Sequence, residues 1–72
     1  MFSENLIHLR KLKNISQEEL AEKLNVSRQT ISKWETGESL PDIEKTKLLA
    51  ELFNVSIDDL VNFEKTSPSL GI

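Results

Sequence analysis

A short pattern of apolar and polar positions recurs four times along the chain: an apolar residue, a serine, and a second apolar residue four positions after the serine. Such a serine can cap the N-terminus of a helix, and the two apolar residues can then meet across the first turn. Three of the copies follow an asparagine, which tolerates the left-handed conformation that ends a helix. The serines are Ser3, Ser16, Ser27 and Ser56, and the asparagines are Asn14, Asn25 and Asn54.

The apolar spacing between these junctions predicts an all-α fold of five helices. Pro41 marks the start of the fourth helix, because a proline at the first helical turn loses no hydrogen bond. The expected helices cover residues 4–13, 17–24, 28–36 and 42–53, with a short fifth helix after Ser56. Leu6, Leu9, Leu20, Ala21, Leu24, Ile31 and Trp34 are expected to face inward.

The second and third helices are expected to form a helix-turn-helix. Ser16 and Glu19 have the spacing of a capping box, and Gly37 is placed to end the third helix. The small side chain of Ala21 lies where two helices would cross closely, and a three-residue turn separates them. This combination is typical of the DNA-binding helix-turn-helix, whose second helix enters the major groove.

The outward face of the third helix carries polar residues at positions i, i+1, i+4 and i+5. Arginine and lysine can bind guanine, glutamine can bind adenine, and serine can bind several base edges. The alternative is an ordinary solvated helix face, but the turn that precedes this helix favours base contacts. The predicted base-contacting residues are Arg28, Gln29, Ser32 and Lys33.

The net charge of −3, taken alone, argues against binding to nucleic acid, but the distribution of the charges changes this conclusion. Residues 1–36 carry a net charge of +1, whereas residues 37–72 carry −4. A DNA-binding protein needs a basic surface at the contact and not a basic total. We therefore expect the acidic half to face away from DNA and binding to be sensitive to salt.

Other classes of function have little support in the sequence. The chain has no cysteine, its single histidine is His8, and it has no glycine-rich phosphate loop. We therefore expect no enzyme activity, metal, cofactor or small-molecule ligand. No apolar run approaches the roughly 18 residues of a membrane span, and the first residues lack the features of a signal peptide. A soluble, cytoplasmic protein is expected.

A set of residues at fixed spacing matches a known family. These residues are Leu9, Arg10, Ser16, Gln17, Leu20, Ala21, Val26, Ser27, Ile31, Trp34, Glu35, Gly37 and Pro41. With them the chain resembles the Xre, or Cro/repressor-like, helix-turn-helix family, which includes the phage lambda-type repressors. Departures are mild: Asn25 and Asn54 stand where the family often has glycine, and Thr46 where it usually has leucine. The resemblance implies a compact, five-helix, lambda-repressor-like DNA-binding domain over residues 1–63, with residues 64–72 as a tail or linker.

The resemblance also implies roles for individual residues. Arg10 should pair with Glu35, and Gln17 should reach a DNA phosphate, unless it is a capping-region glutamine hydrogen-bonded to water. Carboxylates would repel a phosphate, so Glu18, Glu19 and Glu22 should lie on the side of the second helix that faces away from DNA. The fourth helix should turn Ile43, Thr46, Leu49, Ala50 and Phe53 inward. The expected phosphate contacts are Gln17, Ser27, Thr30 and Thr36, with the backbone after Gly37.

A second group of apolar residues, on the fourth and fifth helices and just beyond them, suggests a surface for self-association. A dimer is expected because one reading helix covers too few base pairs to select an operator. The residues of this group are Leu48, Leu52, Ile57, Val61 and Phe63. We expect a sequence-specific, double-stranded DNA-binding transcriptional regulator, a repressor that binds a near-palindromic operator as a homodimer. The alternative is a protein-interaction or antitoxin-like module, or the DNA-binding end of a longer regulator.

Overall fold

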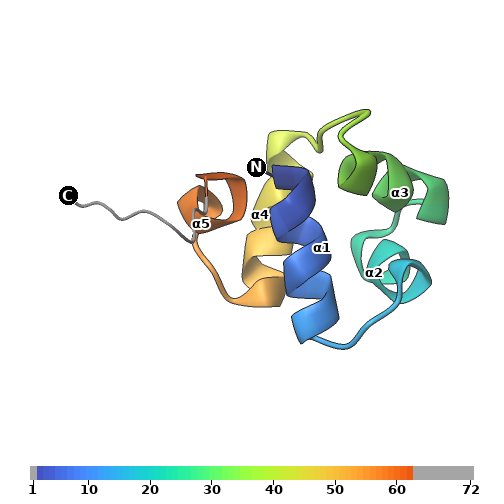
Figure 1. The fold of residues 1–72 in the computed structure, drawn as a ribbon, viewed down its shortest axis with the longest axis horizontal. Helices are drawn as coiled ribbons and strands as arrows, with labels where there is room; N and C mark the ends of the chain where they lie inside the picture. Colours follow the sequence, from blue (N-terminus) through green and yellow to red (C-terminus); the bar gives the residue numbers. More distant parts are fainter. Residues whose placement is uncertain (1, 63–72) are drawn as a thin grey trace.

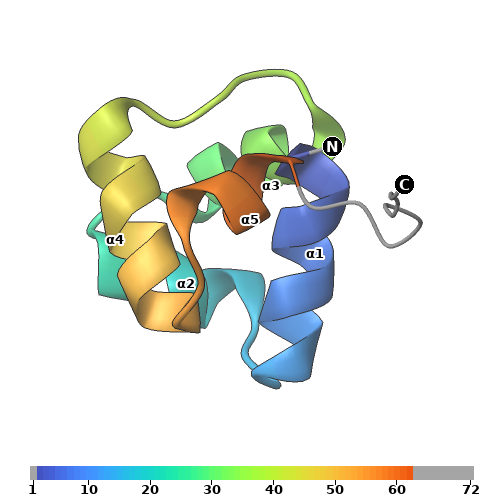
Figure 2. The same ribbon diagram turned by 90° about the vertical axis from the view of Figure 1, so that its left-hand side faces the viewer.

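The structure, a computed structural model, describes residues 2–62, and its regular structure within them is helical. Helices α1 and α4 occupy the middle, with α2 and α3 on one side and α5 on the other (Figure 1). Turned by 90°, the molecule shows α5 between α1 and α4, both of which it contacts (Figure 2). The helices are α1 (Phe2–Leu12), α2 (Gln17–Leu24), α3 (Arg28–Thr36), α4 (Ile43–Phe53) and α5 (Ile57–Asn62).

The helix ends are formed by the capping residues that the sequence predicts. The Ser16 hydroxyl accepts a hydrogen bond from the Glu19 backbone at 3.0 Å, and the Glu19 carboxylate accepts one from the Ser16 backbone at 2.8 Å. Ser27 and Ser56 cap α3 and α5 in the same way. The three asparagines, Asn14, Asn25 and Asn54, have positive φ values of 59°, 59° and 58°. The predicted ends of α2 at Asn25 and of α4 at Asn54 are therefore confirmed, whereas α1 ends at Leu12, one residue before the predicted end.

Two helix starts differ from the predicted ones. Helix α1 begins at Phe2, so Ser3 lies inside the helix instead of capping it. The two additional residues place Phe2 in the first turn of α1, and its side chain joins the core, where it is 7% exposed. Helix α4 begins at Ile43 because the carboxylate of Asp42 accepts a hydrogen bond from the Lys45 backbone at 2.8 Å and so acts as the N-cap.

Each helix contributes one fully buried aliphatic side chain to a single core. These residues are Leu6, Leu20, Ile31, Leu49 and Leu60. Trp34 belongs to the same core at 4% exposed, as predicted, and is therefore not available to stack on a base. The core thus holds α3 in place from its inner side and leaves its outer side free.

The inner face of α4 is mostly the predicted one, with Ile43 as the exception. Thr46 is buried, and its hydroxyl donates a hydrogen bond of 2.8 Å to the Asp42 carbonyl, which satisfies a polar group in the core. Ile43 was expected to face inward but is 65% exposed. It is the first residue of α4, and the buried part of the face begins one turn later, at Thr46.

Candidate nucleic-acid interface

Helices α2 and α3 are joined by the tight turn that a helix-turn-helix requires. Asn25 ends α2 in the left-handed conformation, and Ser27 caps α3. The Val26 backbone N–H donates to the Ala21 carbonyl at 3.0 Å, which fixes the turn against the end of α2. Ala21 is itself 4% exposed, so its small side chain lies at the helix contact as predicted.

The four predicted base-contacting residues share the outer face of α3. Arg28, Gln29 and Lys33 are exposed, and Ser32 is half-buried. The opposite face is fixed by the burial of Ile31, Trp34 and Glu35. Thr36 follows Ser32 by four residues and so extends the outer face by one turn. We call the set Arg28, Gln29, Ser32, Lys33 and Thr36 the reading face.

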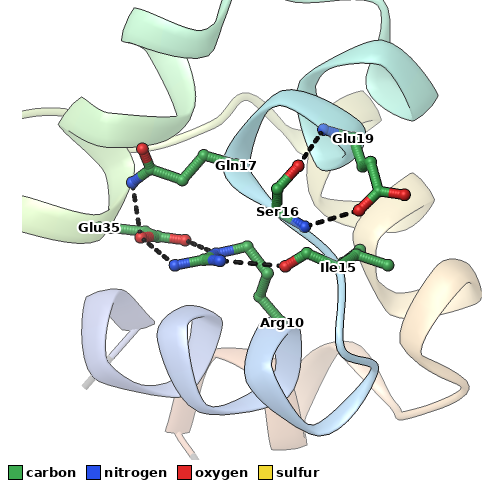
Figure 3. A network of polar contacts seen from close by, with 6 residues as sticks. All are labelled: Arg10, Ile15, Ser16, Gln17, Glu19 and Glu35. Carbon is green, nitrogen blue, oxygen red and sulfur yellow. Dashed lines mark hydrogen bonds and ion pairs between the residues drawn. The ribbon is translucent and has the colours of Figure 1, made fainter.

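A buried ion pair ties α1 to α3 (Figure 3). The Arg10 guanidinium donates from Nε to Glu35 Oε2 at 2.6 Å and from Nη2 to Glu35 Oε1 at 3.2 Å. Its Nη1 donates to the Ile15 carbonyl at 3.0 Å. The two side chains are 14% and 6% exposed, so the structure contains the pair expected from the sequence, and water screens it little.

Gln17 belongs to the same network, a contact that no spacing in the sequence indicates. Its Nε2 donates to Glu35 Oε1 at 2.9 Å, and its side chain comes from the first turn of α2 (Figure 3). A primary amide has two N–H groups, so one donor remains for another acceptor. The ion pair therefore orients the residue that is expected to reach a phosphate.

The other expected phosphate contacts have partners within the helix-turn-helix. The Ser27 hydroxyl caps the Thr30 backbone at 3.2 Å and lies 3.0 Å from the Thr30 hydroxyl. The Thr36 hydroxyl lies 3.2 Å from the Lys33 carbonyl, to which it can donate. All of these hydroxyls are at the two ends of α3.

The backbone amides after Gly37 already have partners within the protein. Gly37 has a φ of 83° and forms the left-handed C-cap of α3. The N–H groups of Glu38 and Ser39 both donate to the Lys33 carbonyl, at 2.9 and 3.3 Å. The cap therefore uses these amides, and their contact with a phosphate stays a prediction.

The carboxylates of α2 lie closer to the reading face than expected. Glu18, Glu19 and Glu22 line a shallow surface hollow that also includes Arg28, the first residue of α3. They therefore lie close to the N-terminal end of the reading face and not on a side of α2 that faces away from it. One oxygen of Glu19 is already used by the capping box, which leaves Glu18 and Glu22 as the freer acidic groups beside Arg28.

The residues expected at a dimer interface fall into two groups on α4 and α5. Leu48 and Leu52 line a hollow with Leu24 of α2, whereas Ile57 lines a second hollow, and Glu51 borders both. Leu48 and Val61 are 39% and 38% exposed, while Leu52 and Ile57 pack partly against the core. Phe63 lies outside the described residues.

Three other large apolar side chains are more exposed than those of the expected dimer interface. Leu12, Leu40 and Ile43 are 69%, 70% and 65% exposed, at the end of α1, in the α3–α4 connection and at the start of α4. The exposure of Leu40 was not predicted from the sequence. Within residues 2–62 there is no cluster of histidine and acidic residues suited to a metal ion, and no helix with the length and apolar character to cross a membrane.

Comparison with known proteins agrees with this geometry. The helix-turn-helix family model HTH_3 matches residues 6–60, which span α2, α3 and most of the core. The chain belongs to this family. It is a family of DNA-binding transcriptional regulators with the lambda-repressor-like fold, and not of enzymes.

Similar proteins include both activators and repressors. The HTH-type transcriptional activator BcrR of Enterococcus faecalis is 48% identical over 64 residues, which are 89% of this chain and 31% of BcrR. The cryptic phage CTXphi transcriptional repressor RstR of Vibrio cholerae is 35% identical over 57 residues, which are 79% of this chain and 51% of RstR. The chain therefore spans about a third and a half of these two relatives.

A solved complex shows the same fold on DNA. The crystal structure of the P22 c2 repressor with a synthetic operator superimposes with a TM-score of 0.83 and 30% sequence identity. The similarity covers 89% of this chain and 97% of the repressor chain. The five-helix, lambda-repressor-like fold predicted from the sequence is thereby confirmed.

Proposed function

We propose that the chain binds double-stranded DNA sequence-specifically and acts as a transcriptional repressor, with α3 in the major groove. The observation that carries the proposal is the reading face: polar side chains gather on the outer side of a helix whose inner side is fixed by Ile31, Trp34 and Glu35. A helix held in this way by a preceding tight turn can present its outer side chains to base edges. The P22 c2 repressor, which has the same fold, was crystallised with an operator.

Each group on the reading face suits a particular acceptor or donor. Arg28 and Lys33 are suited to the O6 and N7 atoms of guanine, and Gln29 to adenine. Ser32 is half-buried, so its short side chain can contact only a base that approaches closely. Arg28 lies in the first turn of α3, the part of such a helix that meets base edges most directly.

Phosphate contacts would set the register of α3 in the groove. Gln17 has one amide N–H left after its bond to Glu35 and is held by that bond. Ser27 and Thr30 place hydroxyls at the N-terminus of α3, where the helix dipole favours an anion. Thr36 offers a third hydroxyl at the other end. Such contacts position the protein without reading the sequence.

The mutation Gln29→Ala tests base readout. We expect it to cost about 1–3 kcal/mol of binding free energy on the preferred site and to relax the preference at one base pair. The measurement is equilibrium binding to the preferred duplex and to its single-base variants at fixed salt. Gln17→Ala is the matched control, because losing a phosphate contact should weaken all duplexes by similar factors. Equal losses on every duplex for Gln29→Ala would make it a backbone contact instead.

We further propose a homodimer on a near-palindromic operator. One copy of α3 reads only a few base pairs, which is too few to distinguish an operator from competing sites. Two-fold symmetry places two such helices about 34 Å apart on one face of DNA. Leu48 and Val61 provide exposed apolar surface on α4 and α5, neither of which is part of the helix-turn-helix.

A further inference from the structure

An acidic side chain lies at the C-terminal end of the reading face. Thr36 is exposed on that face, and its hydroxyl is 3.3 Å from Oε2 of Glu38, to which it can donate. The same hydroxyl lies 3.2 Å from the Lys33 carbonyl, so its single proton has two acceptors within the protein. The group expected to donate to a phosphate is thus held beside a carboxylate.

The position of Glu38 is fixed by the end of α3. Gly37 turns the chain with a φ of 83°, and the Glu38 N–H donates to the Lys33 carbonyl at 2.9 Å. These contacts place the residue within one turn of Lys33, beside the reading face. Glu38 is exposed, and no cation within residues 2–62 pairs with it. No ion pair among the described residues therefore neutralises this carboxylate at the edge of the reading face.

We infer that Glu38 acts as an electrostatic brake, which lowers the affinity for every duplex by opposing a DNA phosphate when α3 docks. The inference rests on the proposed function, since it assumes that α3 enters the major groove. The Glu38 carboxylate would repel a DNA phosphate near the C-terminal end of α3, whereas a basic residue at the same position would attract it. The Thr36 hydroxyl must also leave its internal acceptors before it can donate to that phosphate.

A carboxylate near DNA has a second possible role, since it can accept a hydrogen bond from the N4 amino group of cytosine. Two features favour the brake. Base contacts of a helix-turn-helix come mainly from the N-terminal part of the reading helix, whereas Glu38 follows its C-terminus. The neighbouring hydroxyl of Thr36 belongs to the set expected to contact phosphates. The two roles predict opposite results when the charge is removed.

The test removes the charge of Glu38 and retains its size. Glu38→Gln keeps a carbonyl oxygen that can accept from Thr36. Asp59→Asn is the control, because it makes the same change of net charge at an exposed position of α5 that belongs neither to the reading face nor to the proposed dimer interface. We expect Glu38→Gln to tighten binding by about three-fold, both to the selected operator and to a mixed-sequence duplex. The gain should shrink as salt rises, since salt screens exposed charges. Asp59→Asn should leave both affinities nearly unchanged.

A second variant strengthens the comparison. Glu38→Lys should add about one phosphate contact, so the slope of log affinity against log salt should steepen by about one unit. Thermal unfolding of each variant shows that the fold is retained. Equal effects of Glu38→Gln and Asp59→Asn would overturn the brake, and so would a loss of affinity limited to duplexes with one particular base pair. A wild-type protein that binds no duplex at all would instead overturn the proposed function.

Discussion

Glu35→Ala is expected to lower the free energy of unfolding by about 3–5 kcal/mol, because it leaves a charged group buried without its partner. The Arg10 side chain is 14% exposed and would retain only its bond to the Ile15 carbonyl. Gln17 would lose its acceptor as well. A domain of this size has a total stability of about 4–11 kcal/mol, so the loss is a large part of it. Urea denaturation followed by circular dichroism measures the change.

A double-mutant cycle separates the pair from its surroundings. Arg10→Met and Glu35→Leu should each be strongly destabilising, whereas the double variant should recover much of the loss, since apolar residues of similar volume can replace a buried ion pair. The coupling free energy is the difference between the double variant and the sum of the single ones. A coupling indistinguishable from zero would mean that the two side chains act independently.

Leu48→Glu or Val61→Glu is expected to yield a folded monomer whose operator affinity is lower by about 10²–10⁴-fold, because the second reading helix no longer adds its contacts. Both residues are more than a third exposed, so a glutamate can be solvated without disturbing the core. Sedimentation and operator binding measure the two effects. Leu12→Glu is the control, since Leu12 is 69% exposed on α1 and outside the proposed interface.

Leu52 is unsuitable for the same test, because it packs partly against the core and a charge there would destabilise the fold itself. The proposed dimer is contradicted if the wild-type protein sediments as a monomer at high micromolar concentration, both free and bound to DNA. If Leu12→Glu weakens operator binding as much as Leu48→Glu does, the interface lies elsewhere.

The helix boundaries could be predicted because local chemistry determines them. Ser16, Ser27 and Ser56 cap helices with their own hydroxyls, and Asn25 and Asn54 end them with positive φ values. Such interactions involve residues three to five positions apart. Ser3 and Ile43 show the limit, because burial decides where α1 begins and which part of α4 packs inward.

The candidate site could be predicted as a set of residues but not as a network. Periodicity places Arg28, Gln29 and Lys33 on one helix face, which the structure shows to be exposed. The contacts of Gln17 with Glu35 and of Thr36 with Glu38 depend on how side chains meet in space, which spacing does not reveal.

Selection of bound duplexes from a random DNA library tests most directly whether α3 reads DNA. The wild-type protein should enrich one short motif, present as two near-symmetric half-sites with centres about one helical turn apart. In the same selection, Gln29→Ala should lose its preference at the corresponding base pair of both half-sites. Folded protein that retains duplexes without a shared motif, or that retains none, would contradict sequence-specific binding through α3.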